Sequence, residues 1–145
     1  MSVVVAVDGS AESRRAIRLA WQEAAYREAA LIAVTAYRSE RAAGTPPVIR
    51  PVAPARTADE ERMLAESGLR EAVREALGQD AARVELCVAA GAAGRAIVDT
   101  ARQARAELIV LASRAGISML PGTASQHVLR HAHCPVLIAP PSQTG

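Results

Sequence analysis

The sequence predicts an α/β fold: one domain over residues 1–145, with an open sheet of five parallel strands and helices on both faces. Five short apolar runs alternate along the chain with four longer segments of helical periodicity. Crossovers of this kind connect parallel strands with a right-handed sense. The run 108–112 is aliphatic throughout, as expected of a strand that is buried on both faces. A chain of 145 residues also suits a single domain with a full core.

Composition excludes several classes of protein. Half of the residues are hydrophobic, which excludes a disordered chain. The formal net charge is +2 and the arginines are dispersed, without interleaved aromatics, so we expect no nucleic-acid binding. No apolar run approaches the ~20 residues of a membrane span, and no charged leader precedes the first strand. We therefore expect a soluble cytoplasmic protein that does not bind membranes. Cys87 and Cys134 are predicted to be buried, unreactive thiols.

Local signals bound the elements in the first half of the chain. A strand over 3–7 ends at Asp8-Gly9, and Ser10 is a suitable N-cap for a helix over 11–30. A second strand covers 31–37, followed by a proline-bearing segment over 38–56 that we expect to be a flexible surface loop. Thr57 and Glu60 then fit a capping box for a helix that runs to residue 77, with Gly78 after its end.

Apolar spacing indicates which faces of these two helices are buried. In the first helix Trp21 is interpreted as a core anchor packed on the sheet, not as a ligand-stacking group. In the second, Gly68 lowers helix propensity by up to ~1 kcal/mol relative to Ala, and a close contact with the sheet would explain it. The predicted inward positions are Ala16, Ile17, Ala20, Trp21, Ala24 and Ala25, then Met63, Leu64, Leu69, Val73 and Leu77.

The second half of the chain predicts three strands and two helices. Residues 83–90 alternate between apolar and polar or small side chains, which favours a strand at the edge of the sheet. A helix over 95–105, the strand 108–112, a helix over 123–132 and a strand over 135–139 follow. In an open α/β sheet, ligands bind at the carboxyl ends of the strands. The loop 113–123 is therefore the first candidate for a binding site.

The end of the chain resembles the universal stress protein family. That family carries a nucleotide motif, G-x2-G-x9-G-[S/T], followed by a helix and a final strand that begins Pro-Val. Gly122-Thr123 and Cys134-Pro135-Val136 match the family here. Ala112 and Ala115 stand where the two leading glycines of the motif would be, and only six residues separate Ala115 from Gly122. Since alanine adds a Cβ atom and disfavours positive φ, we expect nucleotide binding to be weak.

The resemblance implies a fold and a site. The fold is that of a universal stress protein-like domain over 1–145, adenine nucleotide alpha hydrolase-like, with strand order 3-2-1-4-5. The implied ligand is ATP, with Mg²⁺ as its accompanying ion. Asp8 would contact the ribose or adenine side, the backbone of Val34 would read adenine, and Ala112 and Ala115 would line the loop. The phosphates would be held by Gly122, Thr123, Ala124 and Ser125.

Simpler interpretations of these residues remain open. Thr123 could cap its own helix, and Asp8 could be a turn residue at Asp-Gly-Ser. His127 and His131 lack the further ligands that a metal site needs. The chain has no P-loop, no dinucleotide fingerprint and no nucleophile elbow. Apart from Asp8 we see no general base or metal-binding carboxylate pair, so we expect a binding protein and not an enzyme.

Two hypotheses about function follow. The first is a stress-response module that binds an adenine nucleotide in its crevice. The second is a nucleotide-independent interaction protein of the same family. In either case the apolar last strand would lie at a sheet edge, where an unpaired strand is an aggregation hazard. The resemblance likewise implies pairing through this strand, so we expect a homodimer through residues 136–139.

Overall fold

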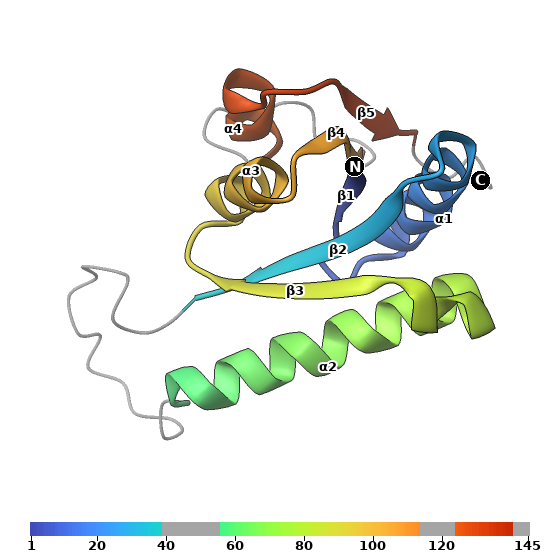
Figure 1. The fold of residues 1–145 in the computed structure, drawn as a ribbon. Coiled ribbons are helices and arrows are strands. Elements are labelled where there is room, and N and C mark those ends of the chain that lie inside the picture. The colour runs from blue at the N-terminus through green and yellow to red at the C-terminus, as the bar shows by residue number, and fades with distance from the viewer. Residues whose placement is uncertain (39–55, 114–123, 141–145) are drawn as a thin grey trace.

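The computed structural model describes residues 1–38, 56–113 and 124–140, and in this part of the chain five strands form one parallel sheet (Figure 1). Their order is β3-β2-β1-β4-β5, so the predicted fold class and strand order are confirmed. The strands are β1 (Ser2–Ala6), β2 (Ala30–Tyr37), β3 (Glu85–Ala90), β4 (Ala106–Ala112) and β5 (Val136–Ala139). The helices are α1 (Ala11–Arg27), α2 (Ala58–Leu77), α3 (Ala93–Gln103), α4 (Ala124–His131) and the 3-10 helix η2 (Gly78–Arg83).

The central strand β1 divides the hydrophobic core into two halves. Its side chains alternate between the faces of the sheet, as the period of a strand requires. Val3 and Val5 pack in the cluster under α1 and α2, whereas Val4 packs in the cluster under α3 and α4. The two pairs of helices therefore cover opposite faces (Figure 1). All three valines are fully buried, which accounts for the continuous apolar run at this position of the sequence.

The helix ends follow the predicted capping signals. The hydroxyl of Ser10 accepts a hydrogen bond from the Ser13 N–H at 3.2 Å, and the Thr57 hydroxyl accepts one from the Glu60 N–H at 3.1 Å. Gly78 ends α2 with a φ of 60°. However, α1 ends at Arg27 and not at residue 30, because Glu28 takes a left-handed conformation with a φ of 53°. This turn leads the chain directly into β2.

Only the second half of α2 packs on the sheet as predicted. Leu69 and Val73 are buried there. In the first half, Met63 is 67% exposed and Leu64 is 50% exposed, so their predicted burial is wrong. The explanation expected for Gly68 is also wrong: among the described residues, no neighbouring heavy atom lies within 4 Å of a Cβ atom built on it. The outward position of Ala25 on α1 is a further correction.

On the other face, α3 and α4 touch through a glycine. A Cβ atom built on Gly94 would lie 2.7 Å from the His127 Cβ atom and 3.2 Å from the Ala124 carbonyl oxygen. The two helices can therefore approach this closely only because residue 94 has no side chain. The helix that contains Gly94 begins at Ala93, not at residue 95 as predicted.

The two edges of the sheet differ. β3 lies at one edge, as its alternating pattern predicted, and β5 lies at the other. On β5 the side chain of Ile138 is 42% exposed, whereas Leu137 packs against the core. Both cysteines are free and only half-buried; burial raises the pKa of the Cys134 thiol. Among the described residues, no helix has the length and apolar character needed to cross a membrane.

Candidate functional site

Asp8 lies just beyond the carboxyl end of β1, in the turn that leads into α1. Its Oδ1 atom accepts two hydrogen bonds from Ser10, one from the backbone N–H at 2.9 Å and one from the hydroxyl at 2.6 Å. The same Ser10 hydroxyl caps α1. The carboxylate is thereby held against the start of the helix. Through Oδ1, Asp8 acts as the turn residue that the sequence allowed, and these two hydrogen bonds fix the direction of its side chain.

Val34 lies inside β2 and presents no side chain to a ligand. It is 1% exposed and packs with Ile97 and Val128 on the α3 and α4 face. Its carbonyl oxygen accepts a hydrogen bond from the Val7 N–H at 2.9 Å. The residues of β2 that reach open space are the next ones, Thr35 to Tyr37.

The ends of β1 and β4 lie side by side, as a ligand-binding crevice between their carboxyl ends would require. Val5 is paired with Val110, so Asp8 and Ser113 both lie beyond the same edge of the sheet. Ala112 is the last residue of β4 and is paired with Ala139. Of the predicted phosphate-binding residues, Ala124 and Ser125 begin α4 and are half-buried. The predictions for Ala115, Gly122 and Thr123 fall outside the described residues.

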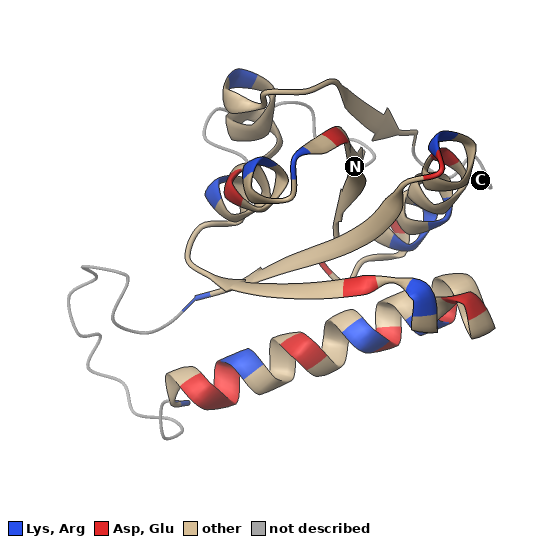
Figure 2. Ribbon diagram, viewed as in Figure 1, with Lys and Arg blue, Asp and Glu red and all other residues tan. Residues whose placement is uncertain are grey.

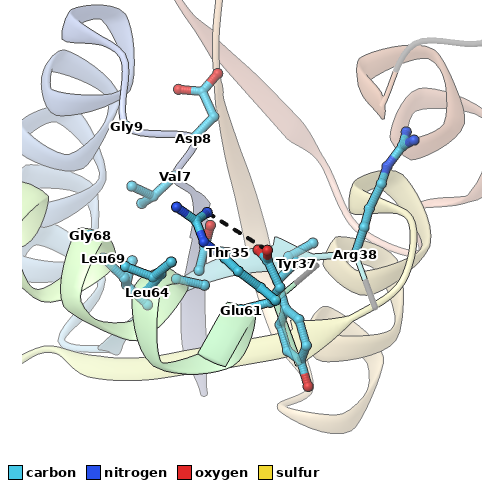
Figure 3. Close-up of a pocket in the computed structure, with 13 residues that line it drawn as sticks. Val7, Asp8, Gly9, Thr35, Tyr37, Arg38, Glu61, Leu64, Gly68 and Leu69 are labelled. Carbon is cyan, nitrogen blue, oxygen red and sulfur yellow. Dashed lines mark ion pairs between the residues drawn. The ribbon is translucent and has the colours of Figure 1, made fainter. Parts of the chain in front are cut away.

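A pocket of about 530 Å³ opens beside Asp8, between the ends of β1 and β2 and the first half of α2 (Figure 3). Leu64 and Leu69 of α2 face Thr35 and Val7 across it. Its lining consists of strand-end residues, two arginines and one face of α2: Val7, Asp8, Gly9, Thr35, Ala36, Tyr37, Arg38, Arg56, Glu61, Leu64, Ala65, Gly68 and Leu69.

Sequence reasoning missed most of this pocket. The contributors from α2 recur at positions 61, 64, 65, 68 and 69, which is the spacing of a single helical face. The apolar pattern of the helix assigns Leu64 to the core instead. The available signal was Gly68 in the middle of this face, because glycine lowers the stability of a helix interior relative to alanine.

Charge around the pocket is balanced. Arg56 and Glu61, which both line the pocket, form an ion pair of 3.7 Å that is drawn as a dashed line in Figure 3. Arginines and acidic residues also alternate along the outer surface of α2 (Figure 2), where Arg70 and Glu66 are 3.1 Å apart. Exposed pairs of this kind contribute little to stability. Within the described ranges, no group of three His, Cys, Asp or Glu residues could hold a metal ion.

Comparison with known proteins identifies the family. The sequence matches the universal stress protein family over residues 1–140. The chain belongs to this family. No match was found among curated proteins. A universal stress protein solved in complex with cAMP is 31% identical, with a TM-score of 0.68 over 96% of this chain and 95% of that one.

Further family structures are more distant in sequence. The universal stress protein from Archaeoglobus fulgidus in complex with dAMP is 25% identical, with a TM-score of 0.59 over 95% of this chain and 96% of that chain. UspA from Lactobacillus plantarum is 23% identical, with a TM-score of 0.69 over 95% and 96% of the two chains. At this last level of identity the likeness supports the fold alone.

Proposed function

We propose that this universal stress protein binds an adenine nucleotide, with ATP as the test ligand, at the carboxyl ends of β1, β2 and β4. The observation that carries the proposal is the open pocket beside Asp8, whose carboxylate is fixed at its edge. The location is the one at which open α/β sheets bind ligands. Two relatives were solved with adenine nucleotides, cAMP and dAMP.

Each group in the site has a defined chemical role in this proposal. A carboxylate has about four acceptor sites, so Asp8 can accept a ribose hydroxyl while Oδ1 keeps its bonds to Ser10. The backbone around Val34 and Thr35 reads the base. Thr123, Ala124 and Ser125 hold the phosphates in this proposal. Ala124 and Ser125 begin α4, where free N–H groups and the helix dipole favour phosphate. With Ala112 and Ala115 in place of the motif glycines, the affinity is low.

Calorimetry tests the proposal directly. Titration with ATP and Mg²⁺ should give measurable binding that Asp8→Ala and Thr123→Val each weaken. Asp80→Ala is the matched control, because this exposed carboxylate lies in η2, which leads into the amino end of β3. The absence of both heat and chemical-shift changes at millimolar ATP would refute nucleotide binding and leave the interaction-protein alternative.

A second proposal concerns assembly: the protein forms a homodimer through β5. The supporting observation is the edge strand itself, where Ile138 is 42% exposed. An exposed apolar edge is an aggregation hazard unless something pairs with it, and two copies related by a two-fold axis would cover each other.

The dimer is tested by sedimentation velocity at tens of micromolar. Ile138→Lys should shift the protein toward monomer without unfolding it. Leu137 is unsuitable for this test because it packs against the core. Exposed Leu129, 45% accessible on α4, gives a control substitution to Lys away from the strand. A wild-type chain that sediments as a monomer would contradict the proposal.

A further inference from the structure

We propose that Gly68 determines ligand specificity: by lacking a side chain, it makes room for a planar purine base between α2 and the ends of β1 and β2. This inference rests on the proposed nucleotide binding and assigns the base to the pocket described above. It also assigns a role to a residue on α2, an element from which the sequence predicted no site residue.

The position of Gly68 on α2 is the first argument. Its neighbour Leu69 is 2% exposed and is the point at which the helix meets the core. Toward the N-terminus the same face of α2 leaves the sheet, and Leu64, 50% exposed, overhangs the pocket. Gly68 lies at the junction, on the face that lines the pocket.

Neither of the two reasons that explain glycine at positions 78 and 94 applies to Gly68 among the described residues. A positive φ explains Gly78, but Gly68 is not among the residues with positive φ and lies within the helix. Close contact explains Gly94, which meets His127. At Gly68, by contrast, an added Cβ atom would have no described neighbour within 4 Å. Glycine destabilises a helix interior, and neither the backbone conformation nor packing against the described residues requires it here.

What lies beside Gly68 is the open volume of the pocket. Leu64 and Val7 provide apolar surfaces, and Thr35 adds a polar group at the strand end. A planar ring could lie against the bare Cα atom with both surfaces in apolar contact. Asp8 is at the edge of the same pocket, so a base in this place would direct its ribose toward the carboxylate. A side chain at position 68 would take up the space of the ring.

The decisive experiment compares two ligands and three variants. The ligands are ATP and inorganic tripolyphosphate, which has the phosphates without the base. Gly68→Leu should weaken ATP binding by on the order of tenfold or more, and leave tripolyphosphate binding unchanged. Gly68→Ala should raise Tm by about 2–4 °C, since alanine favours the helix, and yet weaken ATP binding. Ser67→Leu is the control, because Ser67 is the exposed neighbour on α2 and does not line the pocket.

A second readout locates the base directly in the wild-type protein. Selective saturation of the leucine methyl groups in the wild-type protein should transfer to the H2 and H8 protons of the purine more strongly than to the ribose protons. Leu64→Ala should reduce this transfer. Equal transfer to base and ribose would place the base outside the pocket and overturn the inference.

The outcomes separate the two proposals. If Gly68→Leu binds ATP like the wild type while Asp8→Ala does not, nucleotide binding stands and the role of Gly68 is refuted. If the wild type binds no ATP, both are refuted. Opposite effects of Gly68→Ala on Tm and on ATP affinity support the inference, because a purely structural glycine would change only the Tm.

Discussion

Adding one methyl group at position 94 should push α3 and α4 apart. The Cβ atom of Gly94→Ala would lie 2.7 Å from the His127 Cβ atom, whereas carbon atoms in contact prefer about 3.5–4.0 Å. The overlap is therefore about 1 Å. His127 Cβ is attached to the backbone and cannot rotate away, so one of the helices must move.

The magnitude follows from two opposing terms. Overpacking of a filled contact costs typically about 1–3 kcal/mol. The gain in helix propensity from alanine is at most about 1 kcal/mol, and it is smaller here because Gly94 lies in the first turn of α3. We expect a net loss of about 1–2 kcal/mol, equivalent to a fall in Tm of about 2–8 °C for a chain of this size.

Urea unfolding followed by circular dichroism measures the effect. Gly68→Ala provides the matched control, since it makes the same change in a helix where no described neighbour lies within 4 Å of the added methyl group. This variant should be more stable than the wild type. His127→Gly removes the atom that the added methyl group would meet, so the double variant should recover part of the loss in a mutant cycle. If Gly94→Ala were as stable as the wild type, or if the two changes were additive, the contact would not be limiting.

Two further predictions concern pH and the nucleotide motif. Burial raises the folded-state pKa of Cys134 above its usual value of 9.0, so the thiol of the unfolded chain ionises at lower pH than the thiol of the folded protein. The contribution of this thiol to the free energy of unfolding is therefore complete below about pH 9 and is lost as pH rises through the folded-state pKa. Cys134→Ala should flatten this alkaline decline in urea unfolding, and an unchanged decline would exclude the thiol as its source. Restoring glycine at Ala112 and Ala115, with three residues added before Gly122, should tighten ATP binding in calorimetry. Equal affinity would show that the lost motif was not limiting.

The helices and strands of the fold were predictable because their signals are local, whereas the strand order came from the family resemblance. Ser10 and Thr57 begin helices and Gly78 ends one, through bonds and dihedral angles that involve only neighbouring residues. The alternation of β1 between two faces follows from strand geometry alone. Even the edge position of β3 could be inferred from the weaker burial pattern of its own residues. None of these inferences needed the path of a distant element.

The site was less predictable because it depends on how one element stands relative to another. Periodicity identified the face of α2 that contains Leu64 and Gly68, but not where that face departs from the sheet. A capping signal predicts that the helix begins after Thr57. The distance from this helix to the ends of β1 and β2, however, depends on tertiary packing. Asp8, predicted as a nucleotide contact, lies beside the pocket, and its bonds to Ser10 give it a structural role in the turn before α1.

These observations place the two halves of the proposed site under different constraints. On the β4 side, Ala112 and Ala115 replace the glycines that would let the backbone approach phosphate. On the β2 side, Gly68 leaves a space open beside α2, although alanine at this position would make the helix more stable. Alanine where phosphate would bind, together with glycine where a base would lie, predicts that the affinity of the proposed site comes mainly from the base and the ribose. In that case Gly68 and Asp8 contribute more to nucleotide affinity than the start of α4 does.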